Sequence, residues 1–293
     1  MILRSWLFVP GDSERKLAKA NDSGADALIL DLEDSVISSR RQHGRELVKE
    51  FLHGQGRHCE IWVRINPFES MEMSADLRML SDVPVCGVVL PKAAGPDEVT
   101  KLRQALLGNW GADAQLRILA IAAETPASVF ALGQYGHVRP AGLAGLTWGA
   151  EDLAAELGAL TNRDEHGRWT GPFEMARNLC LLAARDAGVE PIDTVFADFR
   201  DEAGLHDSCR LARRDGFSGK LAIHPNQVAI INDGFAPSVD EVKRAQRIVQ
   251  MFADSPTDGA LSLDGQLIDR PHLVQAERLV DLANRLAARQ ASS

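Results

Sequence analysis

Short apolar runs recur along this chain, and turn-forming stretches with Gly, Pro, Asn or Asp separate them. The pattern predicts eight buried strands, at residues 6–9, 27–32, 60–65, 86–90, 118–123, 142–148, 194–197 and 220–223. Helical spacing of apolar residues between them predicts helices at 14–21, 38–51, 74–81, 96–107, 125–132, 172–187 and 201–214, with a shorter one ending at 157. Eight strands that alternate with helices are typical of a (β/α)8 TIM barrel, which we place at residues 1–235.

The fifth run is the centre of this prediction. Residues 118–123 are apolar without interruption, and the run is followed directly by Glu124. Pro126 then begins the next helix, because proline suits the first helical turn. A carboxylate at the carboxyl end of a buried parallel strand lies where barrel enzymes place their catalytic groups. Glu124 is therefore our first candidate site residue.

Residues 236–293 exceed what a barrel needs. Residues 239–252 and 271–289 have the spacing of amphipathic helices. Between them, two Asp-Gly pairs flank a short apolar alternation, which predicts a β-hairpin. We expect this segment to form a C-terminal lid with helices and a hairpin.

Composition excludes several classes of protein. The chain has 293 residues, 45% of them hydrophobic, which is enough for a full core. Its net charge of -9 argues against a nucleic-acid partner, which needs a basic surface. No apolar run approaches the roughly 18 residues of a membrane span. The four cysteines are far apart and form no Cys-x-x-Cys, so we expect free thiols and a cytoplasmic protein.

Glu124 and Asp152 follow neighbouring predicted strands. Two carboxylates at the ends of adjacent strands can share a hard cation, and Mg²⁺ suits such a site because it takes few protein oxygens. The structural alternative is a turn or helix-cap role, since Asp152 lies near a predicted helix start. Glu151 is a rival to Asp152 as the second ligand.

Three acids, Asp31, Glu33 and Asp34, lie within four positions at the end of the second predicted strand. Such close carboxylates repel each other unless a cation offsets their charge. They could orient waters on a metal ion, or they could form an ordinary solvated loop with a helix cap. The pattern alone does not choose between the two.

Basic residues accompany these acids. Arg64 is near the end of the third predicted strand, so its guanidinium could hold a substrate carboxylate, or it could pair with one of the acids. Arg15, after the first strand, is a second candidate for substrate binding. Lys92 allows a Schiff-base aldolase, although pairing with the acids is the simpler interpretation. His224 could be a base, but a single histidine is more often structural.

Several familiar motifs are missing from the sequence. No dinucleotide-binding glycine motif follows a strand, and no Walker loop is present. The Gly-x-Ser-x-Gly elbow of α/β hydrolases is also missing.

Short motifs along nearly the whole chain resemble the citrate lyase β-subunit-like family of the HpcH/HpaI aldolase superfamily. They are LFVPG (7–11), LDLEDSV (30–36), VRIN (63–66), LPK (90–92), ETP (124–126), WGAEDL (148–153) and GKLAIHP (219–225). The tail motif GQLIDRP (265–271) resembles the lid of malyl-CoA lyase-type members.

The resemblance implies a (β/α)8 barrel that assembles as a homotrimer or hexamer, with residues 236–293 as lid and oligomerisation segment. It implies Mg²⁺ held by Glu124 and Asp152, and a substrate carboxylate bound by Arg64 with help from Arg15. It also implies that Asp269 closes the active site of a neighbouring subunit. The lid favours a CoA thioester over an acyl-carrier-protein substrate.

These implications predict a Mg²⁺-dependent carbon–carbon lyase. It would convert a 3-hydroxyacyl-CoA carboxylate, such as malyl-CoA, methylmalyl-CoA or citryl-CoA, into a 2-oxo acid and an acyl-CoA. Arg64, Asp269 and Asp34 are the predicted catalytic residues, and Glu124 is expected to contact both metal and substrate. The alternatives are a thioesterase that uses the same site, a Schiff-base aldolase and a non-catalytic subunit of a lyase complex.

Overall fold

The computed structural model describes residues 3–54, 59–110 and 116–292. The chain divides into two compact units. One contains residues Leu3–Asn232, and the other contains the C-terminal segment from Asp233 onward. Each unit has its own architecture.

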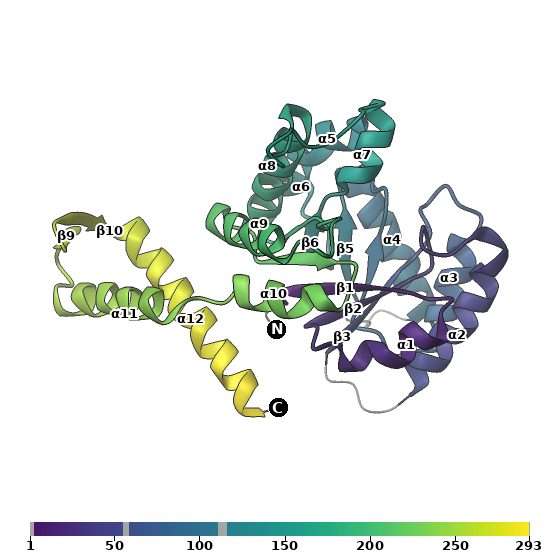
Figure 1. Ribbon diagram of the computed structural model, residues 1–293, viewed down its shortest axis with the longest axis horizontal. Helices are drawn as coiled ribbons and strands as arrows, with labels where there is room; N and C mark the ends of the chain where they lie inside the picture. The colour runs from purple at the N-terminus through teal and green to yellow at the C-terminus, as the bar shows by residue number, and fades with distance from the viewer. Residues whose placement is uncertain (1–2, 55–58, 111–115, 293) are drawn as a thin grey trace. The chain divides into compact units, whose positions relative to one another are not determined.

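The first unit is a closed barrel of eight parallel strands, in which each strand pairs with the next and β8 pairs with β1 (Figure 1). The strands are β1 (Ser5–Pro10), β2 (Ala27–Asp31), β3 (Glu60–Arg64), β4 (Gly87–Leu90), β5 (Arg117–Ile121), β6 (Leu143–Thr147), β7 (Glu190–Asp193) and β8 (Gly219–Ala222). The predicted TIM barrel is confirmed. Because all strands run in one direction, their carboxyl ends meet at one end of the barrel.

Helices follow the strands around the outside of the barrel (Figure 1). They are α1 (Glu14–Ala20), α2 (Arg41–His53), α3 (Met73–Leu80), α4 (Pro96–Trp110), α5 (Pro126–Ala131), α6 (Tyr135–Val138), α7 (Ala150–Leu157), α8 (Gly171–Ala187), α9 (Glu202–Asp215) and α10 (Asn226–Gly234). Short 3-10 turns occur at Asn21–Ser23, Ser38–Arg40 and Leu132–Gln134. Thr125 caps α5 through a capping box, and Pro126 is its first residue, as the sequence predicts.

Apolar side chains from the strands fill one shared core cluster, in which Trp6 and Trp62 pack edge to face with ring centroids 5.0 Å apart. Gly87 makes room for this packing. A Cβ atom at Gly87 would lie 2.3 Å from the Trp62 ring, so no larger residue fits without moving the indole. The barrel interior is therefore filled by packed side chains.

The seventh strand is not where the sequence predicts it. The prediction was 194–197, but β7 is Glu190–Asp193 and Thr194 lies just beyond its end. The pattern missed this segment because Pro191 and the acidic residues Glu190 and Asp193 are unusual in a buried strand. Pro191 has no N–H to donate, but its carbonyl accepts a hydrogen bond from the Ser218 N–H at 3.0 Å, so the segment is still bonded on that side.

Asp193 is acceptable in a strand because cations surround it. Lys220, on the neighbouring strand, is fully buried with its Nζ 3.1 Å from Asp193 Oδ2, and Arg177 of α8 lies 3.2 Å from Oδ1. The indole N–H of Trp148 also donates to Asp193, at 2.9 Å. Burial alone would raise the pKa of Asp193, but Lys220 and Arg177 outweigh burial and hold that pKa below its usual range.

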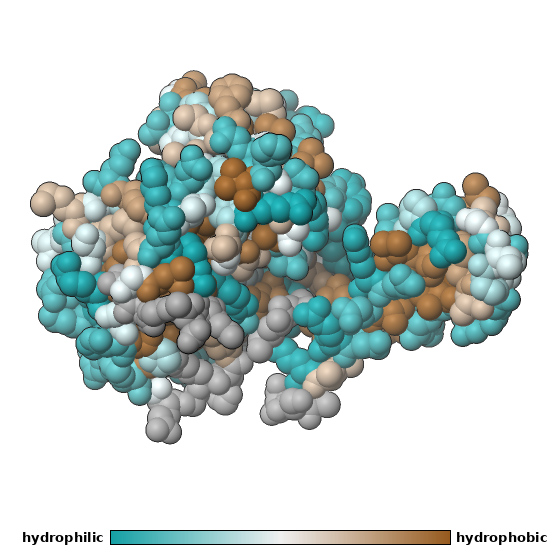
Figure 2. Space-filling model, turned by 180° about the vertical axis from the view of Figure 1, so that it is seen from behind, coloured by the Kyte–Doolittle hydropathy of each residue, from teal (hydrophilic) through white to brown (hydrophobic). Residues whose placement is uncertain are grey.

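The second unit contains α11 (Val239–Asp254), a hairpin of β9 (Ala260–Leu263) and β10 (Gln266–Asp269), and α12 (Arg270–Ser292). The predicted hairpin and flanking helices are confirmed. This second unit has its own hydrophobic core, which includes Ile248, Phe252, Leu263 and Ile268. Figure 2 shows further apolar side chains gathered on the surface of this unit, and Leu267 is 70% exposed.

No helix in the described ranges is long and apolar enough to cross a membrane. The four cysteines, all within the described part of the chain, form no disulfide.

We predict that Asp193→Asn lowers the free energy of unfolding at pH 7 by about 3–5 kcal/mol, because Lys220 would remain buried without its partner. A carboxylate with a depressed pKa stabilises the fold above its unfolded pKa, and that contribution is lost as the pH falls through the lower folded value. The difference between the parent and the variant should therefore be complete at pH 7 and shrink below about pH 4. Urea denaturation at both pH values measures it.

Asp207→Asn is the matched control, since Asp207 is exposed and faces Arg210 at 3.5 Å. It should change the unfolding free energy by less than about 1 kcal/mol. If both substitutions lowered the unfolding free energy equally, the buried ion pairs of Asp193 would not be the source of the stability.

Candidate active site

A cavity of about 610 Å³ opens at the carboxyl ends of the barrel strands. Its lining includes residues that the sequence singled out, among them Arg15, Arg64, Glu124, Asp152 and His224. The barrel brings them together because each follows or ends a different strand, or lies on the helix after it. The predicted position of the site is thus supported by a real cavity.

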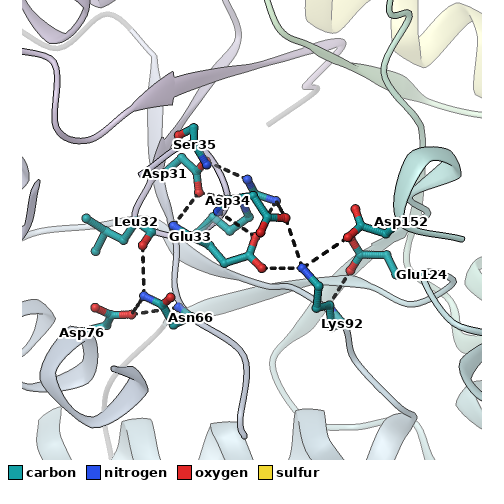
Figure 3. Close-up of polar contacts among 11 residues, drawn as sticks. Asp31, Leu32, Glu33, Asp34, Ser35, Asn66, Asp76, Lys92, Glu124 and Asp152 are labelled. Atoms are coloured by element: carbon teal, nitrogen blue, oxygen red, sulfur yellow. Dashed lines mark hydrogen bonds and ion pairs between the residues drawn. The ribbon is translucent and has the colours of Figure 1, made fainter. Parts of the chain in front are cut away.

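Glu124 and Asp152 are neighbours in this cavity, with their carboxylates side by side in Figure 3. Glu124 lies three residues beyond the end of β5, and Asp152 lies in the first turn of α7. Both are slightly farther from a strand than the sequence predicted. Glu124 is only 2% exposed, and burial, followed by the charge of Asp152, raises the pKa of Glu124 to about 8.

Lys92 stands between the acidic groups of the site (Figure 3). Its Nζ is 3.1 Å from Asp34 and 3.3 Å from Asp152, and it also contacts Glu33. Burial alone would lower the pKa of the Lys92 ammonium, but Glu33, followed by Asp152 and Glu124, raises that pKa. A Schiff-base nucleophile must lose its proton, so this environment opposes the aldolase alternative.

Arg64 pairs with the acidic loop after β2. Its Nε and Nη2 donate to the two Asp31 oxygens at 2.7 and 2.6 Å, and its Nη1 lies 2.9 Å from Glu33. Burial alone would raise the pKa of Asp31, but Arg64 outweighs burial and lowers it. The bidentate pair explains how two buried acids are tolerated beside the cavity.

The same loop is held by its own backbone and by Asn66, which lies two residues beyond the end of β3. Asp31 accepts hydrogen bonds from the main-chain N–H groups of Glu33 and Ser35, and these bonds stabilise the conformation of the loop. Asn66 donates to the Leu32 carbonyl at 3.0 Å and to buried Asp76 at 2.8 Å (Figure 3). Asp34, by contrast, is half exposed and lines the cavity.

The other predicted residues divide into those that face the cavity and those that do not. Arg15 lines the cavity together with Lys16 and Lys19 of α1, which gives this wall a positive charge. His224 also lines it, but its Nδ1 accepts the Asn226 N–H at 3.2 Å, as in the structural interpretation. Asp269 ends β10 in the C-terminal unit, where it contacts His272, so its part in the site stays a prediction.

The choice between the two acids of α7 follows from their partners. Glu151 accepts a hydrogen bond from Asn162 at 2.9 Å, whereas Asp152 faces Lys92 and Glu124. Asp152 is therefore the better partner for Glu124 in binding a cation.

The donor set suits a magnesium ion. Within the described part of the chain no group of three His, Cys, Asp or Glu side chains is arranged around a metal position. A cation at Glu124 and Asp152 would thus have two protein carboxylates and leave its other positions to water and substrate, as Mg²⁺ commonly does. Burial, followed by the charge of Asp152, raises the pKa of Glu124, and a bound cation would offset that charge.

Two features of the site were missed by sequence reasoning. Lys92 has a left-handed backbone, with a φ of 50°, and its N–H donates to Glu124. Gly149 leaves space that the Glu124 side chain fills. No local pattern signals either role, because both concern a residue more than 20 positions away in sequence.

A parallel barrel with paired carboxylates and a basic wall at its carboxyl end defines a class of metal-assisted barrel enzymes acting on anionic substrates. Residues 4–225 match the HpcH/HpaI aldolase/citrate lyase family, to which this chain belongs. The resemblance seen in the sequence motifs is confirmed.

Relatives match over almost the whole chain. The (3S)-malyl-CoA thioesterase of Cereibacter sphaeroides is 34% identical over 295 residues, with 99% of this chain and 97% of the relative covered. The mitochondrial citramalyl-CoA lyase of Rattus norvegicus is 31% identical, with 96% and 86% covered. Mycobacterium tuberculosis CitE, solved with magnesium, acetoacetate and coenzyme A, has a TM-score of 0.81 at 29% identity, with 97% and 98% covered.

We predict that Arg64→Ala lowers the free energy of unfolding by about 3–5 kcal/mol, because it leaves the buried Asp31 carboxylate without its cation. Arg40→Ala is the control, since Arg40 pairs with Asp12 at 2.7 Å but is half exposed. Its loss should amount to about 1 kcal/mol or less. Urea denaturation at pH 7 compares the two, and equal losses would show that the Arg64 pair does not hold the acidic loop.

Proposed function

We propose that this protein is a Mg²⁺-dependent carbon–carbon lyase. Its substrate is a 3-hydroxyacyl-CoA that carries a carboxylate, such as malyl-CoA, methylmalyl-CoA or citryl-CoA. The products are a 2-oxo acid and an acyl-CoA, and the reverse condensation uses the same groups. The observation that carries this proposal is the Glu124–Asp152 carboxylate pair inside the barrel cavity.

Glu124 and Asp152 are the residues proposed to hold the magnesium ion. When bound, the ion supplies Lewis acidity and positive charge to the oxygens of the oxo acid. Asp34, half exposed at the cavity, is proposed to orient water on the ion's open side. Support comes from relatives crystallised with magnesium, together with acetoacetate or pyruvate.

Arg64 is proposed to orient the substrate carboxylate. Its contacts with Asp31 use two of the five guanidinium N–H donors, and Glu33 lies against a third position. The guanidinium is thus held rigidly while it still lines the cavity, and it adds positive charge beside the oxygen that becomes a carbonyl. Arg15 is proposed as a second group that binds the substrate.

The basic wall of the cavity suits the rest of a CoA thioester. Arg15, Lys16 and Lys19 lie on one helix and line the same cavity as the carboxylate pair. CoA carries several phosphate charges, and long basic side chains at a cavity wall can bind them. One cavity would therefore bind the metal ion at the carboxylate pair and the CoA phosphates at the basic wall.

Asp269 is proposed as the acid–base group, contributed by a neighbouring subunit of a homotrimer or hexamer. In cleavage the hydroxyl proton is released to water and its carbon becomes a carbonyl. The carbon–carbon bond breaks, and its electron pair stays on the carbon beside the thioester. Asp269 gives a proton to that carbon in cleavage and removes it in condensation.

A thioesterase is the second candidate, because a (3S)-malyl-CoA thioesterase is among the relatives that cover nearly the whole chain. There, water would attack the thioester, and free CoA would be released in place of acetyl-CoA. Analysis of the CoA product separates the two reactions. A non-catalytic subunit remains the alternative of a different class, and absence of turnover with every thioester would favour it.

We expect the protein to act in the cytoplasm on small-molecule substrates. Neither a nucleic acid nor a membrane is part of the proposed reaction. The acidic net charge of -9 agrees with this expectation.

We predict that Glu124→Gln and Asp152→Asn each lower the rate of 2-oxo acid release from malyl-CoA by at least about 10²-fold, because each removes one of two metal carboxylates. The unfolding transition should stay close to that of the parent. Glu151→Gln, in the same helical turn as Asp152, should keep most of the activity. Parental rates for both metal-site variants in EDTA would show that the metal assignment is wrong.

We predict that Asp269→Asn keeps magnesium and substrate binding but lowers kcat by about 10²–10⁴-fold, since general acid–base catalysis contributes about that much. Asp264→Asn, in the turn of the same hairpin, is the control and should leave kcat near the parental value. Steady-state kinetics measure kcat and KM separately, and kcat should fall while KM changes little. An unchanged kcat for Asp269→Asn would remove this residue from the mechanism.

A further inference from the structure

The Glu124 carboxylate is oriented by two residues that reach it from different strand ends. The main-chain N–H of Lys92, which lies beyond the end of β4, donates to Glu124 Oε2. Gly149, which precedes α7, lies directly against the Glu124 side chain. We call Lys92 and Gly149 together the Glu124 cradle.

Lys92 reaches Glu124 because its backbone is left-handed, with a φ of 50°. Residues with a Cβ atom rarely adopt this conformation, Asn tolerates it comparatively well, and β-branched residues tolerate it worst. The conformation directs the Lys92 N–H toward Glu124 while its side chain turns toward Glu33 and Asp34. The main chain and the side chain of Lys92 thus contact different acids.

Gly149 is required for space and not for its conformation. Its φ of -117° and ψ of 100° are accessible to any residue. A Cβ atom at this position would lie 2.7 Å from Glu124 Cγ and 2.9 Å from Oε1, which is too close for both to keep their places. A Cβ atom at Gly149 would therefore push the Glu124 side chain out of its place beside Asp152, within the cavity that both acids line.

We propose that Lys92 and Gly149 are positioning residues that aim the Glu124 carboxylate at Asp152 and so set the affinity of the site for a divalent cation. The proposal rests on the metal site of the proposed function. It assigns the effect of Lys92 to its backbone conformation. The Lys92 ammonium has the opposite effect, because a positive charge 3.3 Å from Asp152 competes with a cation for that carboxylate.

Two substitutions of Lys92 separate these roles, since both remove the ammonium but differ in backbone preference. Lys92→Asn keeps a residue that tolerates the left-handed conformation, and Lys92→Val does not. Mn²⁺ binding to the purified full chain is followed by the loss of the free-ion EPR signal, without any substrate. The Asn variant should bind Mn²⁺ at least as tightly as the parent, and the Val variant about five-fold or more weakly than the Asn variant.

A second pair of variants tests the cradle without altering Lys92. Gly149→Ala should weaken Mn²⁺ binding by about five-fold or more, because the new methyl group displaces Glu124. Gly171→Ala is the matched control, since a Cβ atom there meets no neighbouring atom within 4 Å. It should leave Mn²⁺ affinity unchanged. Thermal unfolding of every variant identifies any that are not folded, and Gly149→Ala decides the matter if Lys92→Val does not fold.

The outcomes distinguish this proposal from the one on which it rests. Parental protein that binds no Mn²⁺ would overturn the metal site itself. Parental protein that binds Mn²⁺, with equal affinities in the Asn and Val variants and in Gly149→Ala, would overturn the cradle alone. A merely structural role for Lys92 would lower the unfolding temperature of the Val variant and leave its Mn²⁺ affinity equal to that of the Asn variant.

Discussion

The arrangement of this site depends on crowded negative charge at one end of the barrel. Five carboxylates, from Asp31, Glu33, Asp34, Glu124 and Asp152, lie close to one another, and the cationic side chains of Arg64 and Lys92 contact them. Arg64 neutralises the loop after β2, and the Lys92 ammonium links that loop to Asp152. Glu124 meets only the Lys92 main chain among the hydrogen bonds described for it. Burial, followed by the charge of Asp152, raises the pKa of Glu124, so the carboxylate pair is a natural position for a divalent cation.

The barrel treats its other buried charges differently. Asp193 has the cations of Lys220 and Arg177 and the indole N–H of Trp148 around it, so its pKa falls although it is buried. Glu124 is equally inaccessible, yet its pKa rises. One carboxylate has its charge balanced within the fold and serves stability, whereas the other faces a cavity with its charge unbalanced. This contrast, more than burial itself, separates the structural acid Asp193 from Glu124, the proposed metal ligand.

The fold was largely predictable because periodicity is a local property of the chain. Seven of the eight strands were placed within a few residues, and so were the hairpin and its helices. The exception, β7, contains Pro191 and Asp193, whose presence in a strand depends on partners from β8 and α8. The predicted site residues of the barrel also met in one cavity, because parallel strands must end together. Their exact partners were not predictable, and Arg64 could equally have faced substrate alone.

The sequence by itself determined the barrel, the hairpin-bearing tail and the family, since apolar spacing and short motifs are written in consecutive residues. Only the tertiary structure decided that Asp152, and not Glu151, lies beside Glu124, and that Lys92 contacts three acids. It also showed that Gly149 makes room for a carboxylate 25 positions earlier in the chain. The physical reason is that charge and space act through distances between strands, and no local pattern contains those distances.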